Sequence, residues 1–189
     1  MLWFIIIIIL LVVGAVGFYI STYNNMVKSR NWTDEAWSQI DVQLKRRNDL
    51  IPNLVSTVKG YAKHEQDTLE KVIKMRNQLV DMPADNRQAT MEASNQLTDS
   101  LKSVFALSES YPDLKADAEF TKLMEELTNT ENKIAYARQL FNSSATRYNN
   151  QIQTFPGNIL AGAHNFQKTA YLETPVEEKA APKVSLNRV

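Results

Sequence analysis

The chain has 189 residues, with 21 Lys and Arg against 21 Asp and Glu, so its formal net charge at pH 7 is zero. This length suits one domain plus an appendage, and the balanced charge argues against a nucleic-acid-binding protein, which usually has a strongly basic face. Five glycines are too few for a Gly-rich phosphate loop or an all-β fold, and the absence of cysteine excludes disulfides, thiol catalysis, thiolate metal sites and a lipid-modified cysteine.

The N-terminal run Leu2–Ile20 contains no charged residue. As a helix it would be about 28 Å long, which is close to the hydrocarbon thickness of a bilayer. Trp3 near one end and Tyr19 and Tyr23 near the other fit the aromatic belts of membrane interfaces. A cleaved signal peptide would need a basic n-region and a small-residue cleavage site, and a buried core helix is the other alternative. We predict a single-pass transmembrane anchor over residues 1–22.

The charges beside this run bear on its orientation. No Lys or Arg precedes it, whereas Lys28 and Arg30 follow it closely, partly offset by Asp34 and Glu35. The positive-inside rule therefore predicts that the protein sits in the cell membrane with the large C-terminal part on the cytoplasmic side.

A first long helix is predicted from about residues 31–34, where Thr33 or Asp34 can cap it, to Val80, before Pro83. Apolar and aromatic residues at three-four spacing mark its buried seam. They are Trp37, Ile40, Leu44, Ile51, Leu54, Val58 and Tyr61.

Three further helices follow from the same periodicity. One is expected from residue 84 or 85 to Ser108, a long one over 114–152, and a short one over 159–166 after Phe155-Pro156-Gly157. Residues 23–172 would form this bundle domain, and the polar, Pro-containing tail 173–189 is expected to be disordered. No β pattern competes, so the predicted fold is all-α: a membrane helix followed by an elongated up-and-down bundle.

The predicted lengths do not match, because the first long helix would overhang its neighbours and expose part of its seam. One resolution is a chain reversal near residues 49–53, at Pro52, which would make a four-helix bundle. The other is a continuous helix, kinked at Pro52, whose surplus face binds another chain or the membrane surface. The unbroken spacing through Arg47, Ile51 and Leu54 and the lack of glycine there favour continuity.

Arg47 is the charged residue inside the seam, and arginine is rarely buried unless paired. One interpretation is that its stem packs while its guanidinium reaches water. The other is an ion pair with Glu131, which shares the three-four register of Leu127 and Ile134 and lies within a turn of the same level. Such a pair would fix the register of the bundle. Arg138 is a lesser candidate of the same kind.

The sequence resembles the LemA family in three blocks, which are residues 36–65 (AWSQIDVQLKRRNDLIPNLVSTVKGYAKHE), 131–149 (ENKIAYARQLFNSSATRYN) and 155–161 (FPGNILA). Their order and spacing match, behind a hydrophobic N-terminus, and the resemblance spans roughly residues 20–172. It implies a bacterial, membrane-anchored, all-helical up-and-down bundle, and it implies no reaction.

Catalytic and metal chemistry find no support in the residue pattern. His64-Glu65 begins like the zinc-protease motif HExxH but continues with Thr68, and His64 and His164 are the two histidines of the chain. No nucleophile-elbow signature is present. We therefore expect no enzyme activity, cofactor or metal.

The leading functional hypothesis is a non-catalytic scaffold that binds other membrane or envelope proteins, or itself, through its amphipathic face. The alternative is an extracytoplasmic sensor with a ligand pocket between helices. The Asn-rich end of the third long helix is interpreted as a solvated face or, alternatively, as a contact surface, and Phe155, Pro156 and Ile159 are interpreted as a seal of the bundle end. The candidate interaction residues are Pro52, Asn53, Lys59, Tyr61, His64, Asn142, Tyr148, Asn149, Phe155 and Pro156.

Overall fold

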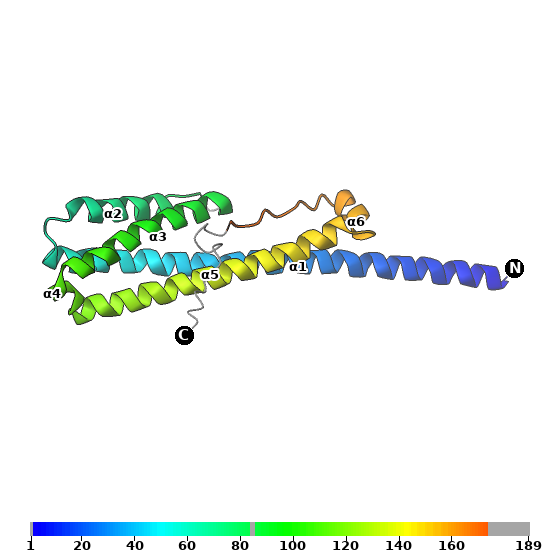
Figure 1. Ribbon diagram of the computed structural model, residues 1–189. Coiled ribbons are helices and arrows are strands. Elements are labelled where there is room, and N and C mark those ends of the chain that lie inside the picture. The colour runs from blue at the N-terminus through cyan, green and yellow to red at the C-terminus, as the bar shows by residue number, and fades with distance from the viewer. Residues whose placement is uncertain (1, 84–85, 174–189) are drawn as a thin grey trace, which may run out of the picture. The chain divides into compact units, whose positions relative to one another are not determined.

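The computed structural model describes residues 2–83 and 86–173, and all regular elements within them are α-helices (Figure 1). The predicted all-α class with an apolar N-terminal helix is therefore confirmed. The helices are α1 (Leu2–Tyr61), α2 (Gln66–Val80), α3 (Arg87–Ser110), α4 (Pro112–Lys115), α5 (Ala118–Gln153) and α6 (Gly157–Ala163).

The chain divides into two compact units, which are described one at a time. Among the described residues, unit 1 contains 2–43 and 132–171, and unit 2 contains 44–83, 86–131 and 172–173. Each unit therefore includes part of α1 and part of α5, while α2, α3 and α4 belong to unit 2 and α6 to unit 1. The predicted tail lies outside the described residues from position 174 onward.

Helix α1 begins in the apolar run and continues without a break into the bundle. Residues 2–20 are exposed on all sides, and this stretch is long and apolar enough to cross a membrane. The prediction of a separate helix starting near residues 31–34 is wrong. Residues 21–33 contain neither glycine nor proline, so nothing in them interrupts the backbone ladder that the apolar run begins.

The chain reverses at residues 62–65, and neither predicted resolution of the length mismatch is right in full. The helix does pass through Pro52, but it ends at Tyr61 instead of Val80. Folding back there places Leu69 and Val72 of α2 in the core of unit 2, where they are at most 1 % exposed. A straight helix would have left both side chains in water, so the burial of apolar surface outweighs the local helix preference of Lys63 and Glu65.

Pro52 leaves one backbone acceptor of α1 without its helical partner, because proline lacks the N–H that would bond to the carbonyl of Asn48. The side chain of Arg76 on α2 donates from Nε to this Asn48 carbonyl oxygen at 3.4 Å. The partner helix thus satisfies the backbone group that the proline frees, and α1 continues.

The core of unit 2 is contributed by the end of α1, by α2, α3 and α4, and by the start of α5. Contacts join Tyr61 to Asp117 and Arg47 to Glu131, so α1 and α5 run antiparallel here. The core comprises Ile51, Leu54, Val55, Val58, Ala62, Leu69, Val72, Leu79, Ala93, Leu97, Leu101, Val104, Leu114, Phe120, Leu123 and Leu127.

Two helix starts in unit 2 are capped by side chains. Asn86 accepts a hydrogen bond from the backbone N–H of Ala89 at the start of α3, and Asp117 accepts one from Phe120 at the start of α5. These caps place the helix starts a few residues later than the predicted positions 84–85 and 114.

Unit 1 pairs the earlier part of α1 with the later part of α5, again antiparallel. Trp37 packs its ring edge against Phe141 at 6.0 Å between centroids, and Met26 lies in a small core with Tyr148 and Ile152. The remaining members of that core are Leu160 and Ala161 of α6. A helix pair plus the segment after α5 therefore makes up this unit.

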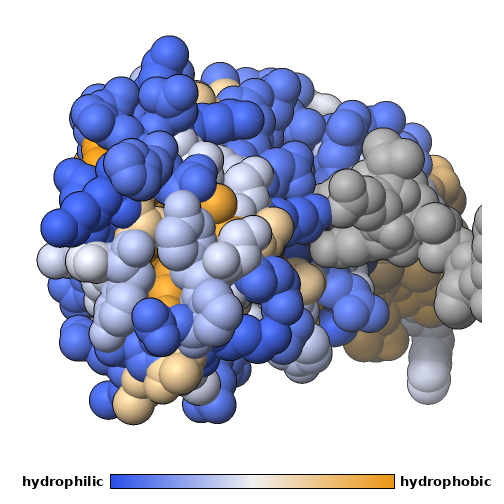
Figure 2. Space-filling model, turned by 60° about the vertical axis from the view of Figure 1, so that its left-hand side comes forward, coloured by the Kyte–Doolittle hydropathy of each residue, from blue (hydrophilic) through white to orange (hydrophobic). Residues whose placement is uncertain are grey.

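The seam of α1 does not expose the surplus face that the sequence led us to expect. Met26 and Ile40 in unit 1, and Ile51 and Val58 in unit 2, are each at most 1 % exposed. The face of the bundle turned to the viewer in Figure 2 is mostly hydrophilic, with apolar side chains in small separate groups. The seam of α1 is therefore largely covered within each unit.

Candidate functional site

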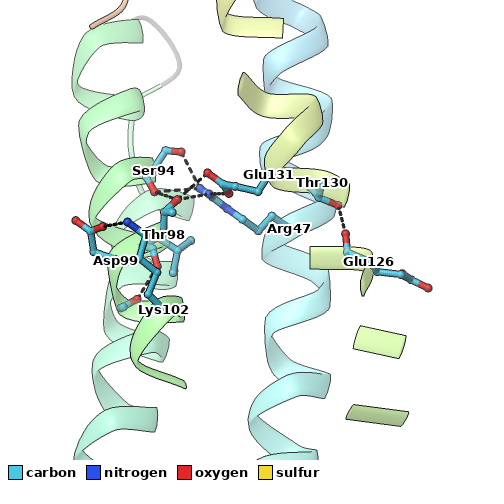
Figure 3. Close-up of polar contacts among 10 residues, drawn as sticks. Arg47, Ser94, Thr98, Asp99, Lys102, Glu126, Thr130 and Glu131 are labelled. Atoms are coloured by element: carbon cyan, nitrogen blue, oxygen red, sulfur yellow. Dashed lines mark hydrogen bonds and ion pairs between the residues drawn. The ribbon is translucent and has the colours of Figure 1, made fainter. Parts of the chain in front are cut away.

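Arg47 is the largest fully buried side chain of the bundle, and its guanidinium is 0 % exposed. Its Nη1 donates to Glu131 Oε2 at 2.8 Å and to Thr98 Oγ1 at 2.9 Å (Figure 3). Its Nη2 donates to the hydroxyl of Ser94 at 2.7 Å and to the Ser94 carbonyl at 3.3 Å. The predicted ion pair between Arg47 and Glu131 is thus present. It lies within a larger polar network that was not predicted.

The α3 members of this network, Ser94 and Thr98, were not predicted, because hydroxyl side chains do not stand out in an apolar three-four pattern. Ser94 and Thr98 lie one helical turn apart on the same face of α3. Thr98 also donates to Glu131 Oε1 at 3.1 Å. Small hydroxyl residues at i and i+4 beside a buried stripe were the signal that would have found them. The network joins α1, α3 and α5, which suits a structural role.

This polar network has no catalytic arrangement. The guanidinium of Arg47 is engaged by acceptors on two other helices, and Glu131 is its carboxylate partner rather than a base beside a nucleophile. Within residues 2–83 and 86–173, no group of three or more His, Asp or Glu residues is placed to hold a metal ion.

A surface groove between α1 and α2 in unit 2 is a second candidate site. It has a volume of about 330 Å³. Its lining includes the apolar side chains of Ile51, Val55 and Ile73, with the cations Lys59 and Arg76 also at its wall. The predicted interaction residues Pro52 and Lys59 both line it, together with Ser56 and Asn77.

Residues 36–186 of the chain match the model of the LemA family. The protein belongs to the LemA family. The match covers most of the chain and includes both the α1 seam and the later part of α5.

Three relatives extend this comparison. This LemA-family chain is 29 % identical to the protein LemA of Metamycoplasma hominis over 84 % of its own length and 73 % of the relative's. It is 23 % identical to the magnetosome protein MamQ 2 of Paramagnetospirillum magneticum, over 87 % and 70 % of the two chains. It is 24 % identical to the magnetosome protein MamQ of Magnetospirillum gryphiswaldense, over 79 % and 64 %. None of these three is named for a catalytic activity, and with its apolar N-terminal helix the protein is a membrane-associated member of the family.

Two of the candidate interaction residues are buried. Tyr148 is 2 % exposed and donates to the carbonyl of Gln167, and its burial raises the pKa of its phenol. Asn149 is 3 % exposed and exchanges two hydrogen bonds with the backbone of Thr169, at 2.8 and 3.0 Å. The prediction of a solvated or partner-binding face is therefore wrong for both, because they hold the segment after α6 against α5.

Tyr61 lies at the end of α1, where it contacts the start of α5. Its hydroxyl donates to Asp117 Oδ2 at 2.8 Å, and this bond to a carboxylate raises the tyrosine pKa. The pKa of Asp117 is lowered, chiefly by the backbone N–H of Phe120 and then by Tyr61. Tyr61 is thus engaged within the bundle, although it is 43 % exposed.

The other candidates are at the surface or partly buried. Asn53 and His64 are exposed, the first on α1 and the second in the turn before α2, while Asn142 is half-buried on α5. Phe155 is 80 % exposed in the turn after α5, and Pro156 beside it is half-buried. Phe155 therefore does not seal the end of the bundle as predicted.

Proposed function

We propose that this LemA-family protein is a membrane-anchored, non-catalytic scaffold that docks a segment of another membrane or envelope protein in the α1–α2 groove. The groove carries the proposal. Ile73 is half-buried at its wall, and Ile51 and Val55, which are 1 % and 5 % exposed, complete an apolar lining that suits the apolar side chains of a helix or an extended segment.

The cations at the groove predict the chemistry of the partner. Lys59 and Arg76 bracket the apolar lining, so acidic side chains on the docked segment would meet complementary charge. Lys59 is exposed and lies in the last turn of α1. A partner segment that combines apolar and acidic residues fits this arrangement best, and no nucleic acid is expected.

The scaffold is proposed to stand on the cytoplasmic side of the membrane. Lys28 and Arg30 follow the apolar run, and no Lys or Arg precedes it. Protease treatment of intact cells should leave a C-terminal epitope tag intact, while lysed cells should lose it. Loss of the tag in intact cells would favour the extracytoplasmic alternative.

The docking proposal is tested by photo-crosslinking in cells of the bacterial source. A photoreactive residue replaces Ser56, which is exposed and lines the groove, and the control replaces Lys71, an exposed α2 residue outside it. We expect an adduct with one membrane or envelope protein at position 56 and none at position 71. Lys59→Glu should reduce that adduct several-fold, because it removes the complementary charge.

Two results would contradict the docking proposal. Equal labelling at positions 56 and 71 would mean that contact is unspecific. An adduct formed only within the same chain, to residues 174–189, would mean that the protein's own C-terminal segment uses the groove. The groove is open to solvent, which does not suit an enclosed ligand site of the sensor type.

A further inference from the structure

The turn after α5 and helix α6 lie at the end of the apolar run, and unit 1 by itself places them there. Helix α5 runs antiparallel to α1 and its Ile152 packs near Met26, so the residues that follow proceed toward the apolar N-terminal part of α1. Met26 is six residues beyond Ile20, or about 9 Å along the helix. The headgroup region of one leaflet has a similar thickness.

Aromatic contacts hold the segment in this position. Tyr19 Oη and His164 Nε2 are hydrogen-bonded at 2.6 Å, and the ring of Tyr23 lies 4.8 Å from that of His164 between centroids. Tyr23 also packs edge-on against Phe166 at 5.9 Å. His164, just after α6, therefore contacts a residue inside the apolar run itself.

Gly157 shows how closely α6 approaches α1. A Cβ atom at this position would lie 2.9 Å from Cε of Met26 and would collide with the carbonyl oxygen of Gln151. Together with the buried Leu160 and Ala161, this close contact fixes which face of α6 turns to α1 and which faces outward.

The outward face carries large apolar side chains at the level of the membrane boundary. Phe155 is 80 % exposed and Ile159 is 62 % exposed. Exposed apolar residues scattered over a surface need no explanation, but these two lie beside the end of a helix that already meets lipid. The segment that carries them contacts the apolar run through the hydrogen bond between His164 and Tyr19.

Basic residues outnumber acidic residues in unit 1. Unit 1, residues 1–43 and 132–171, contains six Lys and Arg residues and three acids, which are Asp34, Glu35 and Asp41. Lys28, Arg30 and Lys168 are exposed among the basic residues, and the guanidinium of Arg30 lies 5.5 Å from the centre of the Phe166 ring. The chain as a whole has zero net charge, so this excess of basic over acidic residues in unit 1 suits an anionic surface.

We propose that α6 and the preceding turn form a second membrane contact, in which Phe155 and Ile159 insert at the interface of a bilayer containing anionic lipids. Lys28, Arg30 and Lys168 lie among the headgroups there. The aromatic contacts with Tyr19 and Tyr23 keep this contact at the depth of the boundary. This second membrane contact requires the membrane helix but no protein partner, so it can be tested separately from the scaffold proposal.

The test measures the depth of single nitroxide labels on the full-length protein in vesicles, which is direct because the natural chain has no cysteine. Labels are attached to Phe155→Cys and Ile159→Cys, with Ser143→Cys, an exposed α5 position about 15 Å before the end of that helix, as the matched control. Collisions with oxygen and with a water-soluble nickel chelate are compared in phosphatidylcholine vesicles with and without phosphatidylglycerol.

We expect labels at 155 and 159 to collide with the chelate several-fold less often than the label at 143, with stronger protection when phosphatidylglycerol is present. Equal chelate access at all three positions in both lipid mixtures would overturn the proposal. Protection of the same size with and without phosphatidylglycerol would overturn its electrostatic part. Circular dichroism of each labelled variant checks that helix content is unchanged.

Discussion

Units 1 and 2 bury parts of the same two helices, α1 and α5, under different covers. In unit 2 the cover is regular, since α2 and α3 complete an apolar core around a paired arginine. In unit 1 the cover is α6 and the irregular segment 164–171, which amide and tyrosine hydrogen bonds hold in place. The buried face of a long helix can thus be covered by further helices or by an irregular segment that side-chain hydrogen bonds hold in place.

The two units also differ in the features that bear on function. Unit 2 has the interhelical groove and the buried ion pair, which need a rigid frame. Unit 1 has the apolar helix and the exposed aromatic turn. Substitutions in unit 2 should therefore affect the free energy of unfolding most, and those in unit 1 should act locally.

The largest effect is expected for Glu131→Gln, which leaves the buried Arg47 without its carboxylate partner. Because Glu131 itself is 36 % exposed, we expect a loss of about 2–3 kcal/mol, at the lower end for a broken buried pair. Denaturant unfolding in detergent, followed by circular dichroism, measures it.

The matched control for this substitution is Glu126→Gln on the same helix. Its pair with Arg46 is 3.9 Å long and joins side chains that are 35 % and 45 % exposed, so the cost should stay below about 0.5 kcal/mol. Equal costs at positions 126 and 131 would show that Arg47 does not depend on its carboxylate.

A smaller and more local effect is expected for Asn149→Ala in unit 1. This change removes both hydrogen bonds to Thr169 and should cost about 1–2 kcal/mol. Amide hydrogen exchange should rise in residues 165–171, while Asn150→Ala, at an exposed neighbour, should leave it unchanged. Unchanged exchange in both variants would mean that the segment is held by other contacts.

The smallest effect concerns Arg76 and Pro52 in unit 2. Arg76→Met should cost about 1 kcal/mol, because the Asn48 carbonyl loses its donor. In a Pro52→Ala background residue 52 regains its own N–H, so the same substitution should cost less than half as much. A double-mutant cycle measures this coupling, and strict additivity would argue against it.

The sequence was most informative where periodicity was regular. Most of the predicted seam of α1 is buried in the cores, and the rise per residue was enough to bring Arg47 to the level of Glu131. The reversal at residues 62–65 was not foreseen because no proline or glycine lies within it. Gly60, just before it, was the weak local signal, and tertiary burial of Leu69 decided the outcome.

The site was harder to predict than the fold, because composition does not distinguish an exposed amide from a buried one. Asn149 and Asn150 are neighbours of the same type, yet the first is tied to Thr169 and the second is exposed. The partner of Asn149 is a backbone group 20 residues away in an irregular segment, which helical periodicity cannot place. The groove likewise depends on the unforeseen position of α2.

The central claim is that one uninterrupted helix passes from the membrane into the bundle. Amide hydrogen exchange of residues 21–30, measured on the full-length protein in lipid nanodiscs, tests it most directly. The account predicts slow exchange throughout this stretch, comparable to residues 34–43 of the same helix. Exchange at the rate of an unstructured peptide would reveal a flexible joint between anchor and bundle and would contradict the account.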